Sequence, residues 1–413
     1  MTENVAAFDQ WIRGRFVALN DELEEIYFAR GDRGVVPDAG ADLRKQLLEE
    51  GHAFVVPLLE EGNTDEGFEA AFDLLGNVGM YMAACRRHEI SEPPRKSVSP
   101  LKEASALAMH LGASLGVVPR FATSHLTTHN PARNGRYKTF TTLQDEALFL
   151  DYNSLAIFAY KRAADALVRI LPLGISHPVT AALLRDASDA LQDVARYNQA
   201  LFDQLDTDRF FYCVRPYYKP YRVGHVEYRG ANAGDFAGIN EIDILLGLCS
   251  ANDSFYSQLL VDKFLYMMPE DQSRLRDCMR CESLLKLFLS ELDASASEAW
   301  FQRNARVFLS ACEAHGRAAA QHHDQLVQKF IQAPSKALSE QSLQNVTASG
   351  VPLEVLLRSL EKLRDLRTAA PRDDIPSRYR DLERLRASLR AADGSTRQVE
   401  QENRNDRDRS HEP

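Results

Sequence analysis

ACEAHGRAAAQHHDQLVQKFI, residues 311–331, is the stretch that decides how this chain is interpreted. It lacks proline, contains a single glycine, and its apolar spacing predicts a long helix. At 3.6 residues per turn, His323 lies on the same face as an apolar stripe formed by Leu326, Val327, Phe330 and Ile331. His322 instead begins a mixed face that continues through Gln325 and Lys329. The helical period therefore selects His323 as the imidazole on the buried side.

An imidazole on a buried apolar face has two ordinary uses. It can form a hydrogen bond with a polar neighbour, which is the usual structural role, or it can bind a metal or a haem iron. The helix alone leaves both uses open for His323.

Composition limits the classes of protein to which the chain can belong. Its 413 residues are 45% hydrophobic and 26% charged, which predicts a globular protein with a substantial core. The formal net charge of −10 argues against binding to nucleic acid or to an anionic membrane, because both need basic surfaces. The six cysteines are scattered, the first residues lack an apolar signal core, and no apolar run reaches 18 residues. We therefore expect a reduced, cytoplasmic protein that does not span a membrane.

Apolar periodicity predicts helices along most of the chain. They cover residues 4–30, 40–50, 64–88, 101–115, 145–170, 178–206, 236–248, 252–267, 270–292, 296–332 and 351–368. The fold class is therefore all-α. The Thr-rich, proline-containing segment 125–143 suggests a boundary between a smaller N-terminal helical domain, residues 1–140, and a larger helical domain, residues 141–370. An amphipathic helix over 371–393 and a polar, disordered tail over 394–413 complete the prediction.

The densest group of aromatic residues lies within residues 209–228. Phe210, Phe211 and several tyrosines surround Arg215 and Arg222. Aromatic walls and a fixed guanidinium are what a pocket for an aromatic amino acid requires, because the ring stacks and the carboxylate forms a bidentate pair. In the alternative interpretation, the tyrosines only pack a loop and the arginines bind backbone carbonyls.

Together these segments resemble the indoleamine 2,3-dioxygenase superfamily, and within it the monodechloroaminopyrrolnitrin synthase family most closely. HDQLVQKFIQAP, which begins at His323, resembles the segment that carries the proximal haem histidine. FFYCVR resembles FFSVLR of the dioxygenase, and RPYYKPYRVG resembles RPFYEPIRVG of the pyrrolnitrin enzyme. GANAGDFAGINEIDILLG and YMMPEDQSRLRD resemble two further dioxygenase segments, GGSAGQSSVFQCFDVLLG and YMPPAHRNFL. The matches keep the family's order over about residues 65–370.

The resemblance implies an indoleamine-dioxygenase-like helical fold whose larger domain binds haem b through His323. It also implies that Arg215 holds a substrate carboxylate beside Phe210 and Phe211. Three residues of GANAG would lie against haem and substrate, and a flexible loop carrying TASG would close over the site. These further expected substrate-binding residues are Asn232, Ala233, Gly234, Ser349 and Gly350. Asn232 replaces a small hydroxyl residue, and TASG has one glycine fewer than the dioxygenase loop.

The activity implied by the resemblance is haem-dependent oxidation of an aromatic L-amino acid, tryptophan or a derivative, with O2 or peroxide at the haem iron. The haem supplies the reactive group, so no catalytic protein residue is expected. Dioxygenation, mono-oxygenation, hydroxylation and oxidative rearrangement all stay open, as does the oligomeric state. The alternatives are a haem-binding sensor or carrier without turnover, and a helical scaffold without cofactor. His125 and His129 could reach the distal pocket, or could simply pack a capped turn.

Overall fold

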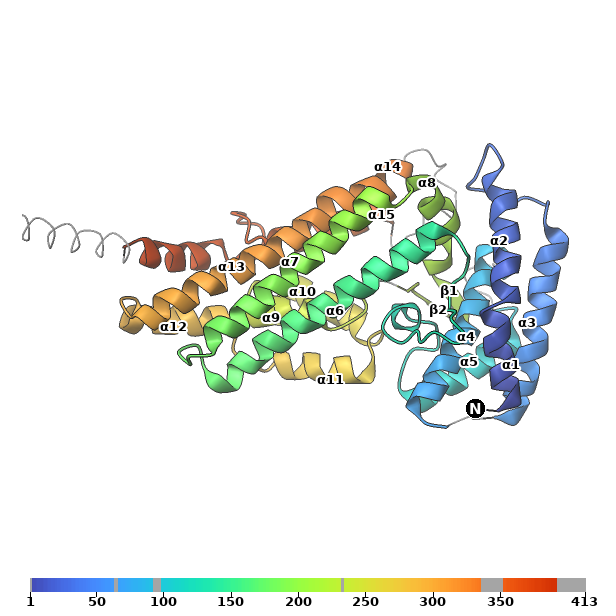
Figure 1. The fold of residues 1–413 in the computed structure, drawn as a ribbon, viewed down its shortest axis with the longest axis horizontal. Coiled ribbons are helices and arrows are strands. Elements are labelled where there is room, and N and C mark those ends of the chain that lie inside the picture. Colours follow the sequence, from blue (N-terminus) through green and yellow to red (C-terminus); the bar gives the residue numbers. More distant parts are fainter. Residues whose placement is uncertain (1, 63–65, 92–97, 232–233, 336–351, 392–413) are drawn as a thin grey trace, which may run out of the picture.

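The computed structural model describes residues 2–62, 66–91, 98–231, 234–335 and 352–391. Helices dominate these ranges, so the all-α prediction is confirmed. Figure 1 shows an elongated molecule, with α1 to α5 gathered at one end and the long helices extending away from them.

The N-terminal end is a group of helices packed around α4. It consists of α1 (Glu3–Ile12), α2 (Arg15–Phe28), α3 (Ala41–Glu61), α4 (Phe68–Arg87) and α5 (Lys102–Leu115). The single helix predicted over residues 4–30 is in fact two, because the chain leaves helical geometry at Gly14. Nearly every residue of α4 after Ala71 is buried, since α1, α3 and α5 all pack against it.

The long helices form the second part of the molecule. α6 (Gln144–Leu173) packs along α7 (Thr180–Gln204), and α7 packs along α13 (Ala299–Gln321). Shorter helices cover this group: α9 (Gly238–Leu246), α10 (Ser254–Phe264), α11 (Pro269–Cys278), α12 (Leu284–Ser295) and α15 (Leu353–Arg367). The helix predicted over 270–292 is interrupted at residues 279–283, where Ser283 caps the start of α12 through its side chain.

The aromatic segment between α7 and α9 is irregular, as its sequence predicts. A short α8 (Thr207–Arg209) leads into a π-helical turn, η2 (Phe210–Val214), and a 3-10 turn, η3 (Arg215–Tyr218). β1 (Tyr221–Val223) and β2 (Val226–Tyr228) then form an antiparallel hairpin, with Tyr221 opposite Tyr228. Gly224 turns this hairpin with φ of +58°, which glycine adopts without strain.

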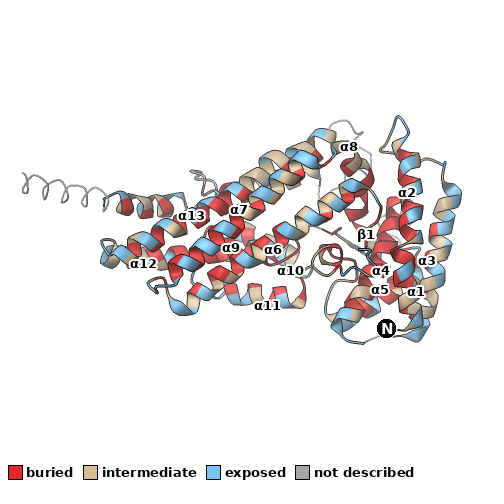
Figure 2. Ribbon diagram, in the orientation of Figure 1, coloured by how far each residue is buried: buried red, intermediate tan, exposed pale blue. Residues whose placement is uncertain are grey.

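Two large apolar clusters hold the chain together, and Figure 2 shows buried residues both among the N-terminal helices and along the long helices. The first joins α1 to α5 with residues 201–231, so the aromatic segment packs on the N-terminal helices although it follows α7 in the chain. The second joins α6, α7, α9, α12 and α13 with Leu382, Leu385 and Leu389. These leucines lie on a helix over 379–391. The predicted boundary at residue 140 stays a prediction, which limited proteolysis would test.

Candidate functional site

A cavity of about 920 Å³ lies among α6, α10, α15, the hairpin and the residues that follow α13. This volume is at the upper end of the range of about 300–1,000 Å³ that small-molecule sites occupy. Apolar residues make up slightly more than half of its wall, and three of them, Val261, Leu265 and Val355, are 65%, 63% and 41% exposed. Large apolar side chains rarely face open space in a group, so the wall suits a large apolar ligand. Further apolar wall residues are Ile157, Phe236, Ile239, Phe255, Leu259 and Leu360.

His323 borders this cavity and has a fixed orientation. Its Nδ1 lies 2.7 Å from Oδ1 of Asp324, and Nη1 of Arg364 lies 3.0 Å from the same oxygen. Burial acts to raise the pKa of Asp324, but its hydrogen bonds with His323 and Arg364 outweigh this and lower it. The carboxylate therefore accepts a hydrogen bond from the Nδ1–H group of His323, which leaves Nε2 as the nitrogen with a free lone pair. Histidines that bind metals are held in this way, by a carboxylate on the other ring nitrogen.

His322 borders the same cavity, which the helical period did not predict. The α-helix ends at Gln321, and residues His322–Gln332 form a π-helix, η4, with more residues per turn. Spacings counted at 3.6 residues per turn therefore do not apply after Gln321, and both imidazoles face the cavity. His322 is exposed to the cavity, and desolvation of its ring by the surrounding side chains, together with the nearby Arg367, lowers its pKa. Of the predicted stripe, Leu326, Val327 and Phe330 are buried.

A buried ionic cluster supports the cavity beside these histidines. Asp243, on α9, is fully buried and accepts hydrogen bonds from Nε and Nη2 of Arg367 at 2.9 and 2.7 Å. Nε2 of His315 and the hydroxyl of Tyr256 each lie 2.7 Å from the same carboxylate. Burial opposes ionisation, but Arg367 and His315 hold the pKa of Asp243 well below its usual range. Asp243 thus fixes Arg367, which borders the cavity, and ties α9, α13 and α15 together.

Arg215 and its aromatic neighbours lie outside the described wall of the cavity. Arg215 is buried, and its guanidinium carbon lies 4.9 Å from the ring centre of Phe211. Burial and the nearby Arg86 lower the pKa of Arg215 to about 10, so it is cationic at neutral pH. Phe210 is also buried, against the rings of Phe149 and Phe330. The predicted carboxylate-binding role of Arg215 therefore stays a prediction.

The glycine-containing segment reaches the cavity at Gly234, whose carbonyl accepts a hydrogen bond from Nζ of Lys263 at 3.3 Å. Asn232 and Ala233 lie outside the described residues, as do Ser349 and Gly350. Their predicted roles stay predictions.

His125 has a structural position. Its Nε2 lies 2.8 Å from the carbonyl oxygen of Phe72, its Nδ1 lies 2.8 Å from the backbone nitrogen of Ala122, and its ring stacks on Phe72. This close approach needs Gly76 on α4, because a Cβ there would lie 2.5 Å from the imidazole. Burial, with Lys138 nearby, lowers the pKa of His125 to about 3. Both ring nitrogens are used by backbone groups, so the geometry favours the packed turn over a distal-pocket role.

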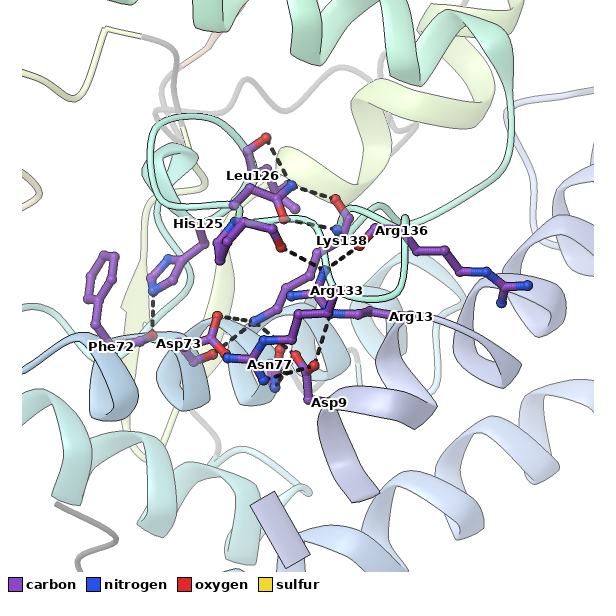
Figure 3. Close-up of polar contacts among 12 residues, drawn as sticks. Asp9, Arg13, Phe72, Asp73, Asn77, His125, Leu126, Arg133, Arg136 and Lys138 are labelled. Atoms are coloured by element: carbon purple, nitrogen blue, oxygen red, sulfur yellow. Dashed lines mark hydrogen bonds and ion pairs between the residues drawn. The ribbon is translucent and has the colours of Figure 1, made fainter. Parts of the chain in front are cut away.

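The loop that carries His125 is anchored by a buried ionic cluster. Figure 3 shows Arg13, Arg133 and Lys138 directed toward Asp9 and Asp73. Nζ of Lys138 lies 2.5 Å from Asp73 and 3.5 Å from Asp9, while Arg133 contacts both carboxylates at 3.1 Å. The segment predicted as a domain boundary is therefore bound tightly to α1 and α4.

Comparison with known families supplies the chemistry that the cavity would accommodate. The sequence matches the family described as monodechloroaminopyrrolnitrin synthase PrnB over residues 2–389. The chain belongs to this family. The family has the indoleamine-dioxygenase-like helical fold, binds haem b, and acts oxidatively on a tryptophan derivative, 7-chloro-L-tryptophan, in pyrrolnitrin biosynthesis. The predictions of fold, haem cofactor and oxidoreductase class are confirmed at this level.

The residues of the cavity fit a haem b. Its flat macrocycle matches the exposed apolar wall residues, and its iron would accept Nε2 of His323, which Asp324 holds in the required tautomer. The two propionates need cations, and four border the cavity: Arg229, Lys263, Arg364 and Arg367.

In the part of the chain that the structure describes, no helix has the length and apolar character of a membrane span.

Sequence reasoning missed most of the residues that support this site. Asp324 was visible directly after His323, but its hydrogen bond depends on the geometry of η4. Asp243 lies in the middle of α9 and is buried, and no local pattern distinguishes it from an exposed acid on a helix. Arg364 and Arg367 reach the site from α15, at the far end of the sequence, and no local pattern marks them.

Proposed function

We propose that this enzyme oxidises tryptophan or a ring-substituted tryptophan and that it holds haem b through Nε2 of His323. The observation that carries this proposal is the contact between His323 and Asp324 at the edge of a large apolar cavity. Bound there, the haem would supply the redox chemistry with O2 or peroxide.

The chain's own residues then have distinct tasks. Asp324 and Arg364 hold His323 in one tautomer, and Asp243 holds Arg367 at the cavity edge. The apolar wall excludes water from a bound ring. Arg215 is proposed to bind the substrate carboxylate, because it is buried, cationic and backed by the ring of Phe211. Positioning of this kind contributes up to about 7–11 kcal/mol to lowering a reaction barrier.

The experiment is product analysis on the purified holoenzyme. L-tryptophan, 7-chloro-L-tryptophan, other halogenated and methylated tryptophans, and L-tyrosine would each be incubated with the protein and an oxygen source. Mass spectrometry would follow the products, and 18-oxygen labelling would count the oxygen atoms incorporated. A product from at least one tryptophan supports the proposal, and the mass change distinguishes dioxygenation from rearrangement. A Soret band without product from any substrate would favour the alternative, a haem sensor or carrier.

A further inference from the structure

Arg229 and Lys263, two of the four cations that border the cavity, lie together at its edge. Arg229 follows β2, and Lys263 lies near the end of α10. Both border the cavity, close to Gly234, whose carbonyl oxygen Lys263 contacts. Their side chains come from segments separated by more than thirty positions, so the fold itself brings these two cations together.

The position of Arg229 is fixed by Tyr266 and Asp235. The guanidinium carbons of Arg229 and Arg120 lie 4.4 and 4.5 Å from the centre of the Tyr266 ring. The carboxylate of Asp235 is fully buried and accepts hydrogen bonds from both arginines. Nη2 of Arg120 lies 3.0 Å from Oδ2 of Asp235, and Nη2 of Arg229 donates to Oδ1. Stacking and a charge-assisted hydrogen bond therefore hold Arg229 before any ligand arrives.

The charges around this arrangement do not balance. Asp235 is one carboxylate shared by two guanidinium groups, and Lys263 adds a third cation beside them. Nε of Arg229 is buried without a hydrogen-bond partner, and so is Nε of Arg120. Burial, with Arg367 and Arg229 nearby, lowers the pKa of Lys263 to about 8, which leaves it mostly protonated at neutral pH.

Other charged residues on the cavity wall do not offset this excess. Arg364 and Arg367 are already paired, with Asp324 and Asp243. The acidic wall residues Glu227 and Asp262 are both exposed, and Glu227 is 3.4 Å from Arg222. Arg229 and Lys263 are partly buried, and cations withdrawn from water without enough counter-charge are unfavourable, so a bound anion would stabilise this end of the cavity.

We infer that Arg229 and Lys263 form a carboxylate-binding subsite of this cavity, an inference that rests on the proposed function. A carboxylate fits because a planar guanidinium and a nearby ammonium provide several charge-assisted donors. Two sources of carboxylate can reach it: a propionate of the haem or the carboxylate of the amino acid. If the amino acid binds at Arg215, the subsite takes a propionate.

The test uses ferric holoenzyme carrying Arg229→Gln, Arg229→Lys or Lys263→Met. The control is Arg162→Gln, which removes an exposed cation of α6 paired with Asp193. Circular dichroism and thermal midpoints would first show that each variant is folded. Arg229→Lys keeps the charge but loses the planar fork, so it separates charge from geometry.

One part of the test measures whether the subsite binds the carboxylate of the substrate. Soret titrations would compare L-tryptophan with tryptamine, which lacks the carboxylate. If the subsite binds the amino acid, the wild type prefers tryptophan tens-fold, and Arg229→Gln and Lys263→Met lose most of that preference. Arg162→Gln keeps it.

The other part of the test measures whether the subsite binds a haem propionate. Loss of haem to an excess of apomyoglobin would be timed for proteins reconstituted with haem and with haem dimethyl ester. If the subsite binds a propionate, Arg229→Gln and Lys263→Met lose haem at least ten-fold faster than wild type. Haem dimethyl ester lacks free carboxylates, so it should dissociate from all the proteins at similar rates.

The inference is overturned if these variants match wild type and Arg162→Gln in both parts of the test. Failure of the proposed function looks different, because the wild type itself would then show no Soret band and no ligand response.

Discussion

The two adjacent histidines differ in what holds them. His323 has Asp324 as an acceptor on Nδ1, whereas no hydrogen bond of the described structure orients His322 in the same way. We predict that His323→Ala loses haem, or its histidine-ligated spectrum, and that His322→Ala largely keeps both. The Soret band and the Fe–imidazole stretch in resonance Raman spectra would report the ligand. The reverse pattern would move the ligand by one residue.

Asp324→Asn is the intermediate variant in this series. It keeps the histidine but weakens the hydrogen bond that orients it, and such second-layer changes lower metal affinity by about 10–100-fold. We expect faster haem loss with the axial histidine retained. An affinity equal to wild type would show that Asp324 does not position His323.

Arg215 gives the second prediction at this scale. A buried Arg–carboxylate pair that loses one partner costs about 2–5 kcal/mol, so Arg215→Ala should weaken substrate binding tens-fold or more. The haem spectrum should change little. Arg215→Lys should restore only part of the affinity, because an ammonium lacks the planar fork. Substrate-induced Soret shifts would measure this. Arg222→Gln is the control, and substrate binding lost there but kept in Arg215→Ala would contradict the assignment.

At the scale of elements, the loop over residues 123–140 is anchored by the ionic cluster that Lys138 and Arg133 form with Asp9 and Asp73. Lys138 is almost fully buried and contacts both Asp9 and Asp73. Removing one partner of a buried ion pair costs about 3–5 kcal/mol. Lys138→Met should therefore lower the free energy of unfolding by that order, measured by urea denaturation. Lys45→Met, at an exposed pair with Glu49, should change it by less than about 1 kcal/mol. Equal effects would show that the cluster does not anchor the loop.

For the whole molecule, His125 is one of the groups through which acid should destabilise the folded protein, beside the buried His88, whose pKa burial also lowers. The pKa of His125 is about 3 in the folded protein and 6.5 in the unfolded chain. Its contribution to the free energy of unfolding is therefore complete above pH 6.5 and is lost as the pH falls toward 3. Between pH 7 and pH 5 this loss is about 2 kcal/mol. Glu146 acts in the opposite direction, because burial raises its pKa to about 7 and its contribution is lost as the pH rises.

Glu146 is present in both the wild type and His125→Asn, so its effect cancels in the difference between their free energies of unfolding. We predict that this difference in the free energy of unfolding narrows by about 2 kcal/mol from pH 7 to pH 5. Urea denaturation at both pH values would measure it. His110→Gln, at an exposed position on α5, should stay parallel to wild type. A constant difference for His125→Asn would mean that the folded protein accepts the protonated imidazole.

The C-terminal end gives a second whole-molecule prediction. Removing residues 394–413, which lie outside the described residues, should leave haem binding and activity unchanged. Ending the chain at residue 378 should instead destabilise the protein, because it removes Leu382, Leu385 and Leu389 from the core, each worth about 1.5–3 kcal/mol. Thermal midpoints of both truncations would test this. Loss of haem in the shorter deletion would show that the tail has a role.

The sequence by itself determined the helical class, the irregular aromatic segment, and the motifs that link the chain to a haem enzyme family. These are local features, because apolar spacing and short motifs depend only on residues that are close together in the sequence. It also placed His323 at the site, although the reason was incomplete: the α-helical period ends at Gln321, and η4 turns His322 to the same cavity.

Only the tertiary structure decided how the site is supported. Arg364 and Arg367 reach the cavity from α15, Asp243 from α9, and Arg229 from the hairpin segment. Charged residues of this kind read as surface residues in a sequence, because their pairing depends on segments that are far apart in the chain. Burial turns such ordinary charges into fixed, strongly interacting groups, and burial is a property of the packed molecule.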